Sequence, residues 1–88
     1  MAKVDDKTLE RELKALANRR RLAIIRHLHI KSEATVGELA EAIKLSFKST
    51  SRHLSVLKSA DLVEHDQRGL MYFYSLTRPF SIVIKNIL

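Results

Sequence analysis

The spacing of apolar residues in this 88-residue chain changes close to Val63. Before that point apolar residues recur every three or four positions, as on one face of an α-helix. After it they alternate, as in strands, through an aromatic-rich segment over 70–77. Only two glycines and one proline interrupt the whole pattern. The chain is therefore predicted to be mainly α, with a small β-hairpin.

Capping residues divide the helical part. Asp5 or Asp6 can begin a helix over 5–17, in which charged residues alternate with leucines at helical spacing. Asn18 is placed to cap a second helix that reaches roughly residue 30.

The next two predicted helices are separated by a tight turn. Thr35 can cap a short third helix, and Glu38 follows three positions later, as in a capping box. A turn over 44–46 follows, and Ser46 can cap a fourth helix that runs to about residue 60. Two helices joined by so short a turn are typical of the helix-turn-helix arrangement.

The remainder is predicted as a hairpin and a last helix. Strands are expected over 62–66 and 70–77, with a turn over 67–69 between them. Pro79 precedes an apolar final helix over 80–88. The order α-α-α-α-β-β-α predicts a winged helix-turn-helix, with the hairpin as the wing and residues 1–88 as a single domain.

A chain of this length has a thin core, so we expect part of its apolar surface to be covered by a partner chain. The nearly all-apolar last helix is the first candidate for that contact. The residues predicted to form the core are Leu9, Leu13, Leu16, Leu22, Ile25, Leu39, Ile43, Leu54, Leu57, Leu62, Tyr74 and Leu76.

Positive charge is clustered. The formal net charge is +6, and residues 18–32 hold five cations without an acid. Residues 44–60 hold four more, again with no acid. Such clustering is typical of proteins that bind polyanions, although a merely solvated basic surface would look the same.

The predicted fourth helix has two unlike sides. On a helical wheel one side carries Phe47, Thr50, Leu54 and Leu57. The opposite side carries Lys48, Arg52, Ser55 and Ser59, with Ser51 at the border. Hydroxyls and cations near a helix N-terminus suit entry into the DNA major groove, where they meet base edges and phosphates. The alternative is an ordinary amphipathic surface helix.

Three segments resemble the ArsR family of winged helix-turn-helix repressors: "LKALANRRRLAIIRHL" (13–28), "TVGELAEAIKLSFKSTSRHLSVLKSADLV" (35–63) and "RGLMYFYSL" (68–76). The block "SRHLSVLKSADLV" is the most specific part. The resemblance implies a homodimer that binds double-stranded operator DNA, typically as a repressor relieved by an effector.

The resemblance also assigns site residues. In the recognition helix it implies DNA contacts by Lys48, Ser49, Ser51, Arg52 and Ser55. It places Arg68 at the wing tip, near the minor groove or a phosphate, and Arg21 in an intramolecular ion pair. It makes the first and last helices the dimer interface. For Arg19 and Arg20, phosphate contact and simple solvation both remain open.

Metal sensing, common in this family, is not expected here. The chain has no cysteine, and the last helix, "FSIVIKNIL", offers no ligand. The four histidines, His27, His29, His53 and His65, do not form a tetrahedral set. We expect no metal and no cofactor, with His53 supporting the recognition helix.

Three positions depart from the family pattern. Asp61 stands where glycine is usual at the end of the recognition helix, a place that often needs a left-handed backbone. Thr50 replaces an apolar residue and is expected to hydrogen-bond to a backbone carbonyl. Phe47 is large for the helix start: it can pack onto the core or stay exposed toward DNA, and packing onto the core is the favoured prediction.

The sequence argues against other classes of protein. It has no paired carboxylates in a pocket context, no glycine-rich phosphate loop and no nucleophile motif, so we expect no enzyme and no catalytic residue. No membrane span or signal peptide is expected, which favours the cytoplasm. A winged-helix module that binds protein instead of DNA is the alternative function.

Overall fold

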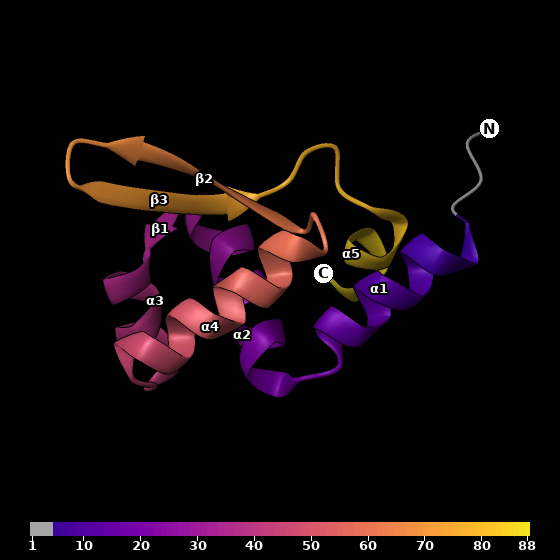
Figure 1. The fold of residues 1–88 in the computed structure, drawn as a ribbon, viewed down its shortest axis with the longest axis horizontal. Coiled ribbons are helices and arrows are strands. Elements are labelled where there is room, and N and C mark those ends of the chain that lie inside the picture. Colours follow the sequence, from indigo (N-terminus) through magenta and orange to yellow (C-terminus); the bar gives the residue numbers. More distant parts are fainter. Residues whose placement is uncertain (1–4) are drawn as a thin grey trace.

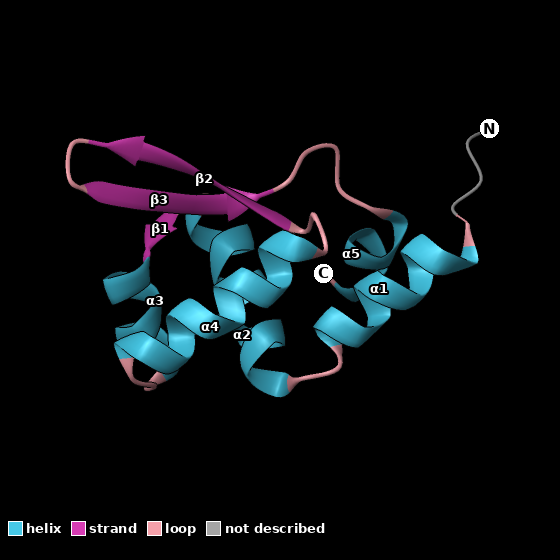
Figure 2. Cartoon of the chain, viewed as in Figure 1, coloured by secondary structure: helices cyan, strands magenta, loops and turns pink. Residues whose placement is uncertain are grey.

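A computed structural model describes residues 5–88 and shows the predicted order of elements, with one short strand added (Figure 1; Figure 2). The elements are α1 (Asp6–Leu16), α2 (Arg19–Lys31), β1 (Ala34–Thr35), α3 (Val36–Ile43), α4 (Phe47–Ser59), β2 (Val63–Arg68), β3 (Met71–Leu76) and α5 (Ile82–Ile87). The winged helix-turn-helix predicted from the sequence is therefore confirmed.

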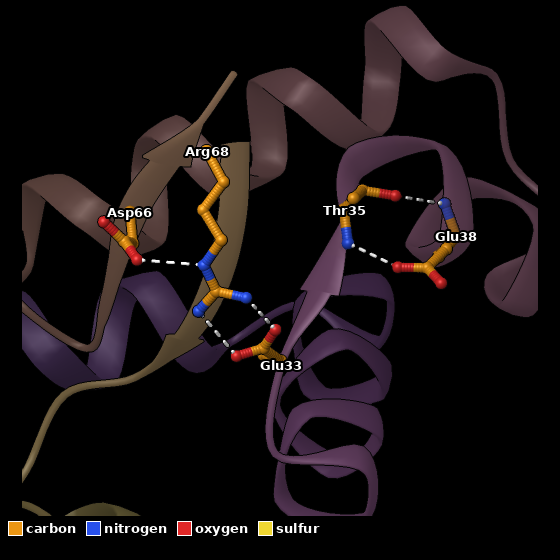
Figure 3. A network of polar contacts seen from close by, with 5 residues as sticks. All are labelled: Glu33, Thr35, Glu38, Asp66 and Arg68. Carbon is orange, nitrogen blue, oxygen red and sulfur yellow. Dashed lines mark hydrogen bonds and ion pairs between the residues drawn. The ribbon is translucent and has the colours of Figure 1, made fainter. Parts of the chain in front are cut away.

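The predicted capping residues begin the first four helices. Asp5 caps α1, and the Asn18 side chain accepts backbone N–H bonds that begin α2. At α3 the capping box is complete: Glu38 accepts the Thr35 N–H at 2.8 Å, and Thr35 accepts the Glu38 N–H at 3.2 Å (Figure 3). Ser46 caps α4. Local hydrogen bonding thus sets where each helix starts.

The first strand of the hairpin extends further than predicted, and the hairpin turns at a different place. β2 continues through Arg68, which pairs with Met71, so the turn is Gly69–Leu70 and not 67–69. Gly69 has φ 64°, the left-handed conformation that two-residue hairpin turns require. Strand pairing therefore continues up to the residue before this glycine.

The short strand β1 was missed from the sequence. It pairs with β3 through Ala34 and Thr35, giving the antiparallel order β1-β3-β2. Two residues show no periodicity, so only the contact with β3 reveals this strand. It ties the wing to the start of α3.

The last helix is shorter than the predicted 80–88. It begins at Ile82, because the Ser81 hydroxyl accepts the Ile84 N–H at 3.2 Å and so caps it there. α5 packs beside α1 at one end of the molecule, while the wing projects at the other end (Figure 1). α3 lies below the wing at that same end in this view, and α4 runs from there toward α1 (Figure 1).

The core lies between α2, α3, α4 and the base of the wing. Its fully buried members include Ile24, Ile25, Leu39, Leu54 and Leu57. Most of the predicted core residues are buried or half-buried, but Leu13 is 49% exposed, so that prediction is wrong for a single chain. Leu13 lies on the outer face of α1. Over residues 5–88 no helix is both long and apolar enough to cross a membrane.

Candidate nucleic-acid interface

Helix α4 is anchored by one polar contact at its start and by an apolar stripe along its inner face. The Thr50 hydroxyl is completely buried and donates to the Ser46 carbonyl at 2.8 Å, as predicted. Leu54 and Leu57 are also fully buried. These contacts fix the rotation of α4 about its axis, so the opposite face points to solvent.

That outer face brings together five of the six predicted DNA contacts. Lys48, Arg52 and Ser55 are exposed, and Ser49 and Ser51 are half-buried at the border with the core. Within residues 5–88 neither Lys48 nor Arg52 forms an ion pair. The face therefore presents uncompensated cations together with hydroxyls that can donate or accept hydrogen bonds.

The side chain of Arg21 connects α2 to α4. Within residues 5–88 it forms no ion pair, so the ion pair that the resemblance implied is not found there. Its guanidinium donates to the Ala15 carbonyl and lies 3.2 Å from Nδ1 of His53. His53 thus links α4 to α2, as predicted for a residue that supports the helix. Burial first, and then the nearby arginines 21, 20 and 52, lower the pKa of His53.

Of the two other arginines at the start of α2, Arg20 has a structural contact. One of its N–H groups donates to the Ile43 carbonyl at 3.1 Å, at the C-terminal end of α3. Arg19 is exposed. Phosphate contact and simple solvation therefore both stay open for Arg19, whereas Arg20 has a hydrogen-bond partner within the protein.

The sixth predicted contact, Arg68, lies apart from the others, on the wing. Its guanidinium donates twice to Glu33, at 2.7 and 3.0 Å, and once to Asp66 at 3.1 Å (Figure 3). It also lies over the ring of Phe73, 4.6 Å from the centroid. Hydrogen bonding to Arg68 lowers the pKa of Glu33, and both carboxylates raise the pKa of Arg68.

Arg68 therefore spends three of its five N–H donors inside the protein. The Arg68–Glu33 fork joins the end of β2 to the segment just before β1. Sequence reasoning missed this pair because its partners are far apart in the chain. In the sequence this pair had one weak signal, which was that Glu33 and Arg68 carry opposite charges.

The prediction that Phe47 packs onto the core is wrong. Its side chain is 62% exposed at the first position of α4. Phe47 is the first residue of α4, and Thr50, three positions further on, is the first residue of this helix that is fully buried. Phe47 instead lies at the surface, next to Lys48 in the chain.

Residues 5–88 contain no group of three or more side chains suited to hold a metal ion. Metal independence stays a prediction, because the effect of an ion on DNA binding is a solution property. What the geometry offers is a charged and hydroxylated helix face, with a hairpin beside it.

The helix-turn-helix domain model matches residues 16–66 of the chain. The transcriptional activator HlyU of Vibrio cholerae is 40% identical over 65 residues, which are 74% of this chain and 59% of HlyU. The arsenical resistance operon repressor of Bacillus subtilis is 31% identical over 67 residues, 76% of this chain and 64% of the repressor. The chain thus spans about three fifths of these curated relatives.

A solved structure extends the similarity to nearly the whole chain. It is the homodimeric winged helix-turn-helix DNA-binding domain of Mb0332 from Mycobacterium bovis, a possible ArsR-family regulator. It is 31% identical and superposes with a TM-score of 0.81, covering 99% of this chain and 83% of that one.

Proposed function

Because this chain belongs to the ArsR-type family of winged helix-turn-helix proteins, we propose that it binds a specific sequence of double-stranded DNA as a homodimer and represses transcription. The observation that carries the proposal is the outer face of α4. It presents Lys48 and Arg52 without acidic neighbours, next to Ser51 and Ser55. Cations and hydroxyls of this kind contact phosphates and base edges.

The roles of the α4 residues follow from their positions. Arg52 lies one turn into the helix, where its planar fork can reach the O6 and N7 acceptors of a guanine. Lys48 lies in the first turn and is placed to meet a phosphate. Ser49, Ser51 and Ser55 complete the contact surface. Arg68 contributes less, because Glu33 and Asp66 already occupy most of its donors.

The dimer is supported by apolar surface that a single chain leaves uncovered. Leu13 on α1 is 49% exposed, and Ile82 on the adjacent α5 is 57% exposed. Pairing of α1 and α5 between two copies would bury both. Mb0332, which superposes over nearly all of this chain, is homodimeric.

Repression is proposed in preference to activation because occupancy of an operator is sufficient for it, whereas activation needs a further surface for the transcription machinery. Among relatives, the arsenical resistance operon protein is a repressor and HlyU is an activator.

A salt titration with duplex DNA separates this proposal from a protein-binding module. Wild-type protein should bind heparin and mixed-sequence duplex, with an affinity that falls steeply as salt rises. The double variant Lys48→Ala/Arg52→Ala should weaken binding and flatten the slope. Lys31→Ala, which removes an exposed cation from the end of α2, should leave both unchanged. Absence of duplex binding at low salt would contradict the proposal.

A further inference from the structure

A group of exposed apolar side chains lies between the start of α4 and the wing. Phe47 is 62% exposed, Leu70 is 98% exposed and Met71 is 52% exposed. Together with Val36 and Tyr72 they line one surface hollow, which we call the wing hollow. Exposed apolar surface of this kind, next to charged side chains, marks a binding site more often than chance.

The charge of the wing makes a purely electrostatic contact with DNA unfavourable. Its two strands carry the carboxylates Glu64 and Asp66 against a single guanidinium, Arg68. Glu33 adds a third carboxylate and pairs with that guanidinium. What the wing presents at its turn is instead the side chain of Leu70. A wing of this composition would be held to a duplex by apolar contact.

Phe47 connects the wing hollow to the proposed DNA-reading face. It is the first residue of α4, next to Lys48 and one turn before Ser51. If α4 enters the major groove by its N-terminal end, Phe47 enters with those side chains. The apolar group that base pairs expose in the major groove is the 5-methyl of thymine, and phenylalanine is one of the residues that contact it.

We propose that Phe47, which lines the wing hollow together with Leu70 and Met71, contacts a thymine methyl in each half-site of the operator. This inference rests on the proposed DNA binding and adds the class of base that the first turn of α4 selects. It gives Phe47 a role that core packing does not supply.

The test removes only the methyl group. Operator duplexes recovered by selection are prepared with deoxyuridine in place of thymidine, one position at a time. For wild-type protein, a single replacement at the contacted position of either half-site should weaken binding about fourfold. This corresponds to about 0.8 kcal/mol, the value of one buried methyl-sized group. Phe47→Ala should bind more weakly than wild type and should not distinguish thymidine from deoxyuridine at that position.

Control variants keep the test specific. Ile30→Ala removes another exposed apolar side chain, which is 75% exposed on α2, and should retain the full deoxyuridine effect. Phe47→Leu should retain part of it. Phe47 is mostly outside the core, so circular dichroism should show all variants folded.

The possible outcomes separate this inference from the proposed function. If wild-type protein binds the operator but no deoxyuridine replacement weakens it, the inference is overturned and DNA binding stands. If Phe47→Ala keeps the wild-type deoxyuridine effect, another residue makes the contact. A uniform loss for Phe47→Ala, without any methyl effect, would indicate a sugar contact and would also overturn it. Failure of wild-type protein to bind any duplex would instead contradict the proposed function.

Discussion

At Asp61 the backbone conformation and the side-chain contact favour different residues. Its φ is 60°, which is the left-handed conformation predicted from the glycine that the family usually has at this position. Its carboxylate pairs with Arg11 at 3.1 Å, but both side chains are more than half exposed, so the pair adds little stability. Asp61→Gly should therefore stabilise the fold by up to ~1 kcal/mol, measured by thermal unfolding.

Asp61→Ala is the matched control. It loses the same ion pair but keeps a side chain in the left-handed conformation, so it should melt below Asp61→Gly. A melting temperature for Asp61→Gly below that of wild type would show that the contact with Arg11 outweighs the backbone strain.

Arg52 and Lys48 are expected to differ in what they contribute to binding. Arg52→Ala should cost ~1–3 kcal/mol on the preferred operator and relax the base preference at one position of each half-site. Lys48→Ala should weaken all duplexes about equally and lower the magnitude of the salt slope by about one per protomer. Binding to operator and scrambled duplex across a salt series distinguishes them. Equal, sequence-independent losses would mean that Arg52 contacts only the backbone.

The Arg68–Glu33 pair gives a prediction in the opposite direction. Glu33→Gln removes a carboxylate that holds two guanidinium donors, so Arg68 becomes available to phosphate. DNA affinity should rise, and the magnitude of the salt slope should rise by up to about one per protomer. Glu64→Gln, an equal change of charge on β2, is the control. Equal gains for both variants would show a net-charge effect only.

At the scale of the elements, the contact between α2 and α4 should make stability depend on pH. The folded protein lowers the pKa of His53 below its ordinary 6.5, through burial and neighbouring arginines. As the pH falls, the histidine of the unfolded chain therefore binds a proton before that of the folded protein does. The contribution of neutral His53 to the free energy of unfolding is fully present above pH 6.5 and is lost as the pH falls through the folded pKa.

Denaturant unfolding at several pH values checks this prediction. The other groups near His53 are the three arginines 20, 21 and 52, which stay charged throughout. His53→Gln should be less sensitive to pH between 7 and about 5 than wild type. An identical pH dependence in both proteins would assign the effect to other groups.

The elements also show why part of the fold was predictable. Helix starts depend on hydrogen bonds within four residues, so Asn18, Thr35 and Ser46 could be identified from the sequence alone. The exposure of Phe47 depends on how the start of α4 packs against the rest of the fold. The contacts of Arg68 depend on Glu33, which is 35 residues away in the chain. Such contacts are set by the tertiary fold, which local patterns do not encode. The exposure of Lys48, Arg52 and Ser55 was predictable because one helical face determines it, whereas their contacts with DNA stay predictions.

At the scale of the whole molecule, the exposed apolar residues of α1 and α5 lie at the end opposite the wing (Figure 1). A dimer formed through that end would place the two α4 helices on either side of its twofold axis, with the wings outermost. Recognition helices arranged in this way reach major grooves one DNA turn apart, about 34–36 Å.

Selection of bound duplexes from a random DNA pool tests the central claim most directly. Wild-type protein should enrich one motif with two inverted half-sites whose centres lie about 10–10.5 base pairs apart. Leu13→Glu, which places a charge in the proposed dimer contact, should enrich a single half-site or none. A wild-type pool that stays unenriched, or that converges on an asymmetric site without a repeat, would contradict a dimer that reads DNA through α4.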